Sequence, residues 1–148
     1  MKLINFSLKD EPLAICIEVD GHVWDLHNTF AFEGLCHFTG ERSVSLRWRS
    51  YRNRATPQPT VEFEIVFAEV DYLEVTPRDS EIADFGEDFC LAGLSRVSSL
   101  DDMKELIEFG VPQVPDFPAD DFHLLFEFRS GQRVRVGAAR AEFQRKLV

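Results

Sequence analysis

The chain has 148 residues, 45% of them hydrophobic and fourteen of them phenylalanine. This length fits one domain, residues 1–148, and the aromatic content excludes an intrinsically disordered chain. The formal net charge of -10 predicts a surface that repels nucleic acid and anionic membranes and attracts basic partners.

Apolar runs are short throughout the chain. The longest spans residues 13–17, whereas a membrane-spanning helix needs about 20 apolar residues. Polar residues from Asn5 onward interrupt any signal-peptide core. The cysteines form no CxxC pair and are widely spaced, as expected for reduced thiols: Cys16, Cys36 and Cys90. We therefore expect a cytoplasmic protein without membrane contact.

The first half of the chain alternates apolar and polar residues, the pattern of half-buried strands. Residues 13–19 predict a strand, and Asp20-Gly21 predicts a tight turn into residues 22–28. Residues 30–38 and 42–50 predict a hairpin that turns at Thr39-Gly40. Two prolines make residues 53–60 a loop.

Residues 61–75 give the longest strand signal. Phe63 and Ile65 share one face, but Glu69 and Asp71 fall on the same parity. We expect a bulge or bend near residues 68–70 that restores the pattern.

The second half of the chain contains strand, loop and helix patterns. Residues 76–88 are acidic and irregular, and residues 89–97 resume an apolar strand. Residues 98–110 predict a helix between a serine N-cap and Gly110. Residues 111–120 form a proline-rich connector, and residues 122–136 predict a terminal hairpin. Residues 138–146 predict a short closing helix. The fold class is mainly β (α+β): a curved antiparallel sheet or sandwich of about seven or eight strands with one or two short helices.

Five arginines and no acid lie within residues 42–54. Arginines beside aromatic residues are typical of phosphate and base contacts. The alternative is that residues 61–67 pair with this strand and place Glu62 and Glu64 opposite Arg49 and Arg47. We favour the second interpretation, because the rest of the chain is strongly acidic and opposes nucleic acid.

The segment Trp24 to Asn28 is a candidate polar site. Asp25, His27 and Asn28 lie close together, and Asp25 with His27 on one face of an extended segment would suit an oriented general base. The alternative is that His27 and Asn28 cap a strand end by bonding backbone groups. We expect no catalytic residue, since no GxSxG or Cys/His nucleophile signature is present. We expect no metal site, since the spacing of His22, His27, His37 and Cys36 matches no ligand pattern. No cofactor motif is present.

A second candidate site is residues 78–89, which we call the acidic segment. Its carboxylates do not have calcium-loop spacing, and little beyond Arg78 compensates their charge. The segment is either a solvated loop or a docking surface for a basic protein, with Phe89 as a further possible anchor. The predicted partner-binding residues are Asp79, Glu81, Asp84, Phe85, Glu87 and Asp88.

The segment VWDLHN, the hairpin FAFEGLCHFTGERSVSLRWRS and the closing FHLLFEFRSGQRVRV together resemble small β-rich bacterial cytoplasmic proteins, including immunity proteins of polymorphic-toxin systems. The resemblance implies a non-enzymatic protein that neutralises a toxin by binding it. Our main hypothesis is therefore an acidic binding protein for a basic partner. The alternatives are small-ligand binding or hydrolysis near Asp25, His27 and Asn28, and a homodimer through an exposed strand edge.

Overall fold

The computed structural model describes residues 1–9, 15–51, 60–83, 85–98 and 121–146. Two 3-10 turns, η1 (Thr39–Glu41) and η2 (Phe85–Phe89), are the helical elements of this part of the chain, which contains no α-helix. Its strands are β1 (Lys2–Ile4), β2 (Ser7–Lys9), β3 (Cys16–Val19), β4 (His22–Asp25), β5 (Phe30–Phe38), β6 (Ser43–Ser50), β7 (Glu62–Thr76), β8 (Leu91–Ser98), β9 (Phe122–Phe128) and β10 (Arg133–Lys146).

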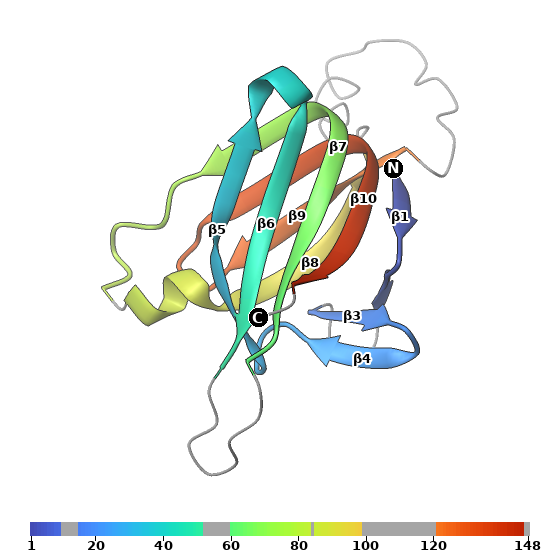
Figure 1. Ribbon diagram of the computed structural model, residues 1–148. Coiled ribbons are helices and arrows are strands. Elements are labelled where there is room, and N and C mark those ends of the chain that lie inside the picture. The colour runs from blue at the N-terminus through green and yellow to red at the C-terminus, as the bar shows by residue number, and fades with distance from the viewer. Residues whose placement is uncertain (10–14, 52–59, 84, 99–120, 147–148) are drawn as a thin grey trace.

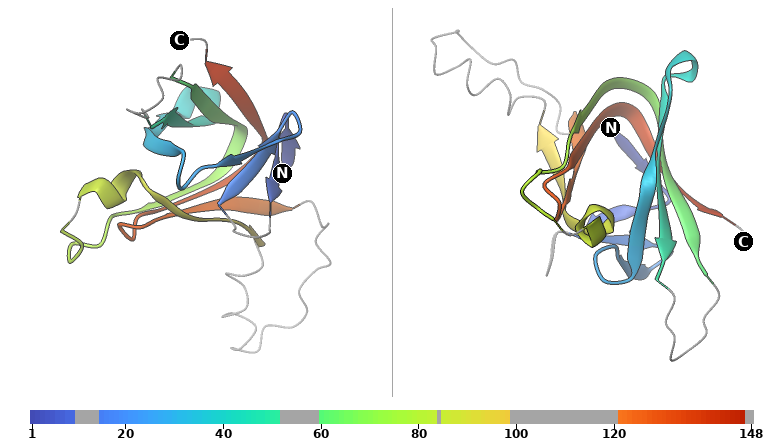
Figure 2. Two further views of the ribbon diagram at one scale, coloured as in Figure 1. Left: turned by 90° about the horizontal axis from the view of Figure 1, so that it is seen from below. Right: turned by 90° about the vertical axis from the view of Figure 1, so that its left-hand side faces the viewer.

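The strands form two sheets. The larger runs β5-β6-β7-β10-β9-β8, all antiparallel, and β1 joins it as a parallel neighbour of β10. This sheet curls into a half-barrel (Figures 1 and 2). The smaller sheet, β2-β3-β4, lies at the open side of the curl (Figure 2). The predicted mainly β class with a curved antiparallel sheet is confirmed.

The pairing of β7 with β10 extends along the whole of both strands. Its register shifts between Gly137 and Ala138, which face Tyr72 and Val70, so β7 carries one extra residue there. Nearby Glu69 has a left-handed backbone with φ 57°. The irregularity predicted near residues 68–70 is confirmed, and such bulges bend a strand and increase its twist.

Aromatic side chains fill the inside of the curl. The Trp24 ring on β4 stacks on Phe30 at a centroid distance of 5.2 Å and meets the edges of Phe63 at 5.6 Å and Phe143 at 5.3 Å. Ile17 of the small sheet is fully buried in the same cluster. The small sheet therefore closes the core that the large sheet leaves open.

The predicted hairpins are confirmed. β3 and β4 join at Asp20-Gly21, whose positive φ angles of 50° and 76° suit a two-residue hairpin turn. β5 pairs with β6, and β9 with β10, in antiparallel register. Residues 53–59, most of the helix predicted at 98–110 and the connector at 111–120 lie outside the described residues.

The closing helix predicted at residues 138–146 is wrong, because these residues are the second half of β10. Ala141 and Phe143 are buried opposite Phe67 and Ile65 of β7. The alanines and long polar residues favour a helix locally, but burial of alternate side chains against β7 outweighs that propensity.

The structure also adds two three-residue strands near the N-terminus, β1 and β2, which the alternation signal did not reveal. No helix within the described residues is long and apolar enough to cross a membrane.

The outer face of the sheet carries one buried polar cluster beside the bulge. The Arg135 Nε donates a hydrogen bond to His123 Nδ1 at 3.1 Å, and both side chains are buried. The Tyr72 ring stacks on His123 at 4.8 Å, with the Arg135 guanidinium 5.0 Å from its centroid. A Cβ at Gly137 would lie 2.6 Å from His123 Nε2 and 2.8 Å from Asp71 Oδ1. Glycine at position 137 is therefore what lets this cluster lie flat on β10.

We expect Gly137→Ala to lower the free energy of unfolding by about 1–3 kcal/mol, the usual cost of overpacking. The His123 ring is held by Arg135 and Tyr72, so it is not free to move aside. The control is Gly40→Ala, whose added Cβ would meet no atom within 4 Å; that change should stay within about 0.5 kcal/mol. Urea denaturation measures both, and equal stability of the two variants would contradict the packing described here.

Candidate functional site

The acidic segment is fastened to the turn between β9 and β10. The Asp79 N–H donates to the Ser130 carbonyl at 2.7 Å, and the Ser130 N–H donates to the Glu87 carbonyl at 3.3 Å. The Arg129 Nε lies 2.6 Å from Glu87 Oε2 in an ion pair. These contacts hold both ends of the segment against one hairpin.

A second ion pair lies within the segment itself. The Arg78 Nε is 3.3 Å from Asp88 Oδ1, and the same guanidinium donates to the Ile82 carbonyl. The expectation that little beyond Arg78 compensates these carboxylates is thus wrong, because Arg129 pairs with Glu87. Composition alone could not reveal this pairing, because Arg129 is distant from Glu87 along the chain.

The predicted partner-binding residues differ in what they present to solvent. Asp79 and Glu81 are exposed, and the Glu81 N–H donates to Asp79 Oδ1 at 2.9 Å, which fixes the turn between them. Phe89 is 49% exposed. Asp84 lies outside the described residues, and the Phe85 side chain is not among those described. We call Asp79, Glu81 and Phe89 the acidic surface.

The Asp25 carboxylate caps the turn that follows β4. Its Oδ1 accepts the N–H groups of His27 at 3.0 Å and Asn28 at 2.9 Å, and its Oδ2 accepts the Asn28 side-chain amide at 2.8 Å. Burial raises the pKa of Asp25, but the bonds from Asn28 and His27 outweigh burial and hold the pKa below its ordinary value. All three predicted residues thus meet, with Asp25 as the capping side chain.

His27 also lies beside a cysteine that sequence analysis did not connect with it. Its Nδ1 is 2.5 Å from the Leu91 carbonyl oxygen and 3.4 Å from Cys90 Sγ. A bond to a carbonyl requires that Nδ1 carries the proton, so this atom does not accept one from the thiol. Burial raises the pKa of Cys90, and nearby Arg129 offsets only part of that rise. The pair therefore holds a protonated thiol, which is a poor nucleophile.

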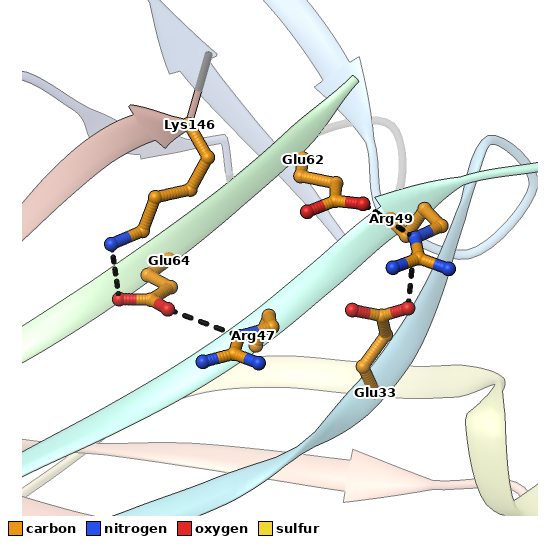
Figure 3. Close-up of polar contacts among 6 residues, drawn as sticks. All are labelled: Glu33, Arg47, Arg49, Glu62, Glu64 and Lys146. Atoms are coloured by element: carbon orange, nitrogen blue, oxygen red, sulfur yellow. Dashed lines mark hydrogen bonds and ion pairs between the residues drawn. The ribbon is translucent and has the colours of Figure 1, made fainter. Parts of the chain in front are cut away.

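The arginine-rich strand β6 faces its own protein's glutamates, as predicted. The Arg47 Nε lies 3.0 Å from Glu64 Oε1 (Figure 3). The Arg49 Nε lies 2.7 Å from Glu62 Oε1 and 2.9 Å from Glu33 Oε1. β6 is an interior strand between β5 and β7. Arg47 and Arg49 are thus engaged in neutralising carboxylates across the sheet.

Glu64 is the most buried carboxylate of this network, with a side chain 10% exposed. Lys146 Nζ lies 3.0 Å from its Oε2, on the other side from Arg47 (Figure 3). Burial raises the pKa of Glu64, but the hydrogen bonds from Lys146, Arg47 and Ser45 outweigh burial and hold the pKa below its ordinary value. The carboxylate is therefore charged in the folded protein.

Two further chemically capable residues, His123 and Arg135, were not singled out by sequence analysis. The signal was present, since alternation along the terminal hairpin places both on the face opposite Phe126. What the alternation does not show is that the third strand, β7, brings Tyr72 to them. Within the described residues, no three histidine, cysteine, aspartate or glutamate side chains are grouped to hold a metal ion.

The comparisons with known proteins add no relative. No family model, no curated protein and no solved structure matches the chain.

We expect Glu64→Gln to cost about 1–3 kcal/mol near neutral pH, the range for hydrogen bonds to charged groups. A lowered carboxyl pKa contributes stability above the unfolded value of about 4.3, and this is lost as pH falls through the folded pKa. The difference between parent and Glu64→Gln should therefore shrink at acidic pH. The matched control, Glu62→Gln, removes a carboxylate 21% exposed and should cost less than about 1 kcal/mol. Urea denaturation from pH 7 to pH 3 measures both, and a Glu64→Gln cost that does not change with pH contradicts the assignment.

Proposed function

We propose that the chain is a non-enzymatic acidic protein that docks a basic protein partner through the acidic surface. The observation that supports this most directly is Phe89, a half-exposed aromatic side chain at the end of η2, close in sequence to the carboxylates of Asp79 and Glu81. Buried aromatic anchors carry much of the binding energy of protein interfaces. Exposed carboxylates in the same segment as such an anchor favour a basic partner.

The distribution of charge supports the same proposal. The chain has 26 acidic and 16 basic residues, and most basic side chains of the described part already form ion pairs with carboxylates of the same chain. These are Lys9, Arg47, Arg49, Arg78, Arg129, Arg133, Arg140 and Lys146. The charge left for long-range attraction is negative, and a surplus of one sign steers oppositely charged partners.

Rigidity is the third support. The bonds to Ser130 and the ion pairs of Glu87 and Asp88 hold the described residues of the acidic segment in place. A surface that is already ordered loses little conformational entropy when it binds.

The partner we favour is a basic toxin, which the immunity-like sequence pattern suggests, and the encounter would take place in the cytoplasm. The alternative site at Asp25, His27 and Asn28 is less favoured, because the carboxylate is occupied by its own turn.

The test compares two matched double variants. Glu81→Lys with Phe89→Ser alters the acidic surface. Glu41→Lys with Phe38→Ser makes the same changes at η1, where Glu41 is exposed and Phe38 is 51% exposed. The immobilised parent chain captures proteins from a nuclease-treated lysate of its host, and each captured protein is purified for association-rate measurements at low and high salt.

We expect a captured protein of basic isoelectric point, whose association is slowed about tenfold or more by the acidic-surface variant at low salt and less at high salt. The η1 variant should associate at the parent rate. Partners that are not basic, or equal rates for both variants, would contradict the proposal.

A further inference from the structure

A cavity near the N-terminus is a second feature of the described surface. An open cavity of about 640 Å³ lies where β1 approaches β8 and the start of β9. The views in Figures 1 and 2 agree that the N-terminal end of β1 lies beside the start of β9. This volume falls in the range of small-molecule sites, about 300–1,000 Å³.

Two cations line the cavity, Lys2 from β1 and Arg96 from β8. Neither has a carboxylate partner among the residues that the structure describes, whereas most other described cations are ion-paired. The Arg96 guanidinium is instead held 5.0 Å from the centroid of the Phe122 ring. Within the described part of this acidic chain, two cations at one cavity without a carboxylate partner are a local reversal of charge.

The remaining walls are largely apolar. Leu3, Phe6 and Phe122 line the same cavity, and Phe6 is buried in the core at 8% exposure. The cavity thus offers positive charge and apolar surface to one occupant. Ammonium and guanidinium groups form strong charge-assisted bonds with carboxylates, and apolar walls favour a hydrocarbon body.

We infer that this cavity binds a small amphiphilic carboxylate, with its charged group at Lys2 and Arg96 and its hydrocarbon body against Leu3, Phe6 and Phe122. The site does not depend on the docking of a basic protein, because it shares no residue with the acidic surface. A ligand that carries negative charge would meet two cations, Lys2 and Arg96, beside an apolar wall.

The test uses octanoate as the probe and 1-octanol, which lacks the charge, for comparison. Isothermal titration calorimetry on the full chain should show tighter binding of octanoate than of 1-octanol. Arg96→Gln should weaken octanoate about tenfold, the loss of one charged hydrogen bond, and Lys2→Gln with Arg96→Gln should weaken it further. Neither should change 1-octanol binding more than about twofold.

The control is Arg145→Gln, which removes an exposed cation that also lacks a carboxylate partner among the described residues but does not line this cavity. It should leave both affinities unchanged. Amide shifts of the parent chain on adding octanoate should centre on residues 2–6, 96 and 122. Absence of octanoate binding, shifts centred elsewhere, or equal octanoate affinity for parent and Arg96→Gln would overturn the inference.

Discussion

The pairing of β7 with β10 is the constraint on which the rest of the structure depends. β6 pairs with the edge of β7 that faces away from β10. β9 and β1 pair with successive parts of the edge of β10 that faces away from β7. The two halves of the large sheet are therefore joined through this one pair. The extra residue that β7 carries opposite Gly137 and Ala138 bends β7 and increases the local twist. The curl that results creates a concave side for the aromatic core and a convex side for the polar networks.

The same pair also arranges the charges. Register along β6, β7 and β10 brings Arg47 and Lys146 to opposite sides of Glu64. The arginines of β6 thereby pair with glutamates of the same chain. The net charge of the chain remains negative. That is why the proposed partner is basic, and why the cavity at Lys2 and Arg96, which departs from this rule, suits an anion.

Period-2 alternation predicted most strands, the hairpins and the arginine–glutamate pairs, because each depends on neighbours in sequence or on one loop. It failed at residues 138–146, where helix-forming residues are held extended by β7. The site was less predictable. The acidic segment was found from its composition, but its partner Arg129 and the contact of His27 with Cys90 join residues that are distant along the chain. Such contacts follow from strand order, which alternation alone does not determine.

Amide hydrogen exchange tests the central role of the β7–β10 pair most directly. If this pair joins the sheet, the amides of residues 63–67 and 141–145 should be among the slowest to exchange and should exchange only on global unfolding. The amides of the small sheet β2-β3-β4 should exchange faster, through local opening. Rapid exchange across residues 138–146, or backbone chemical shifts there that indicate a helix, would contradict the account.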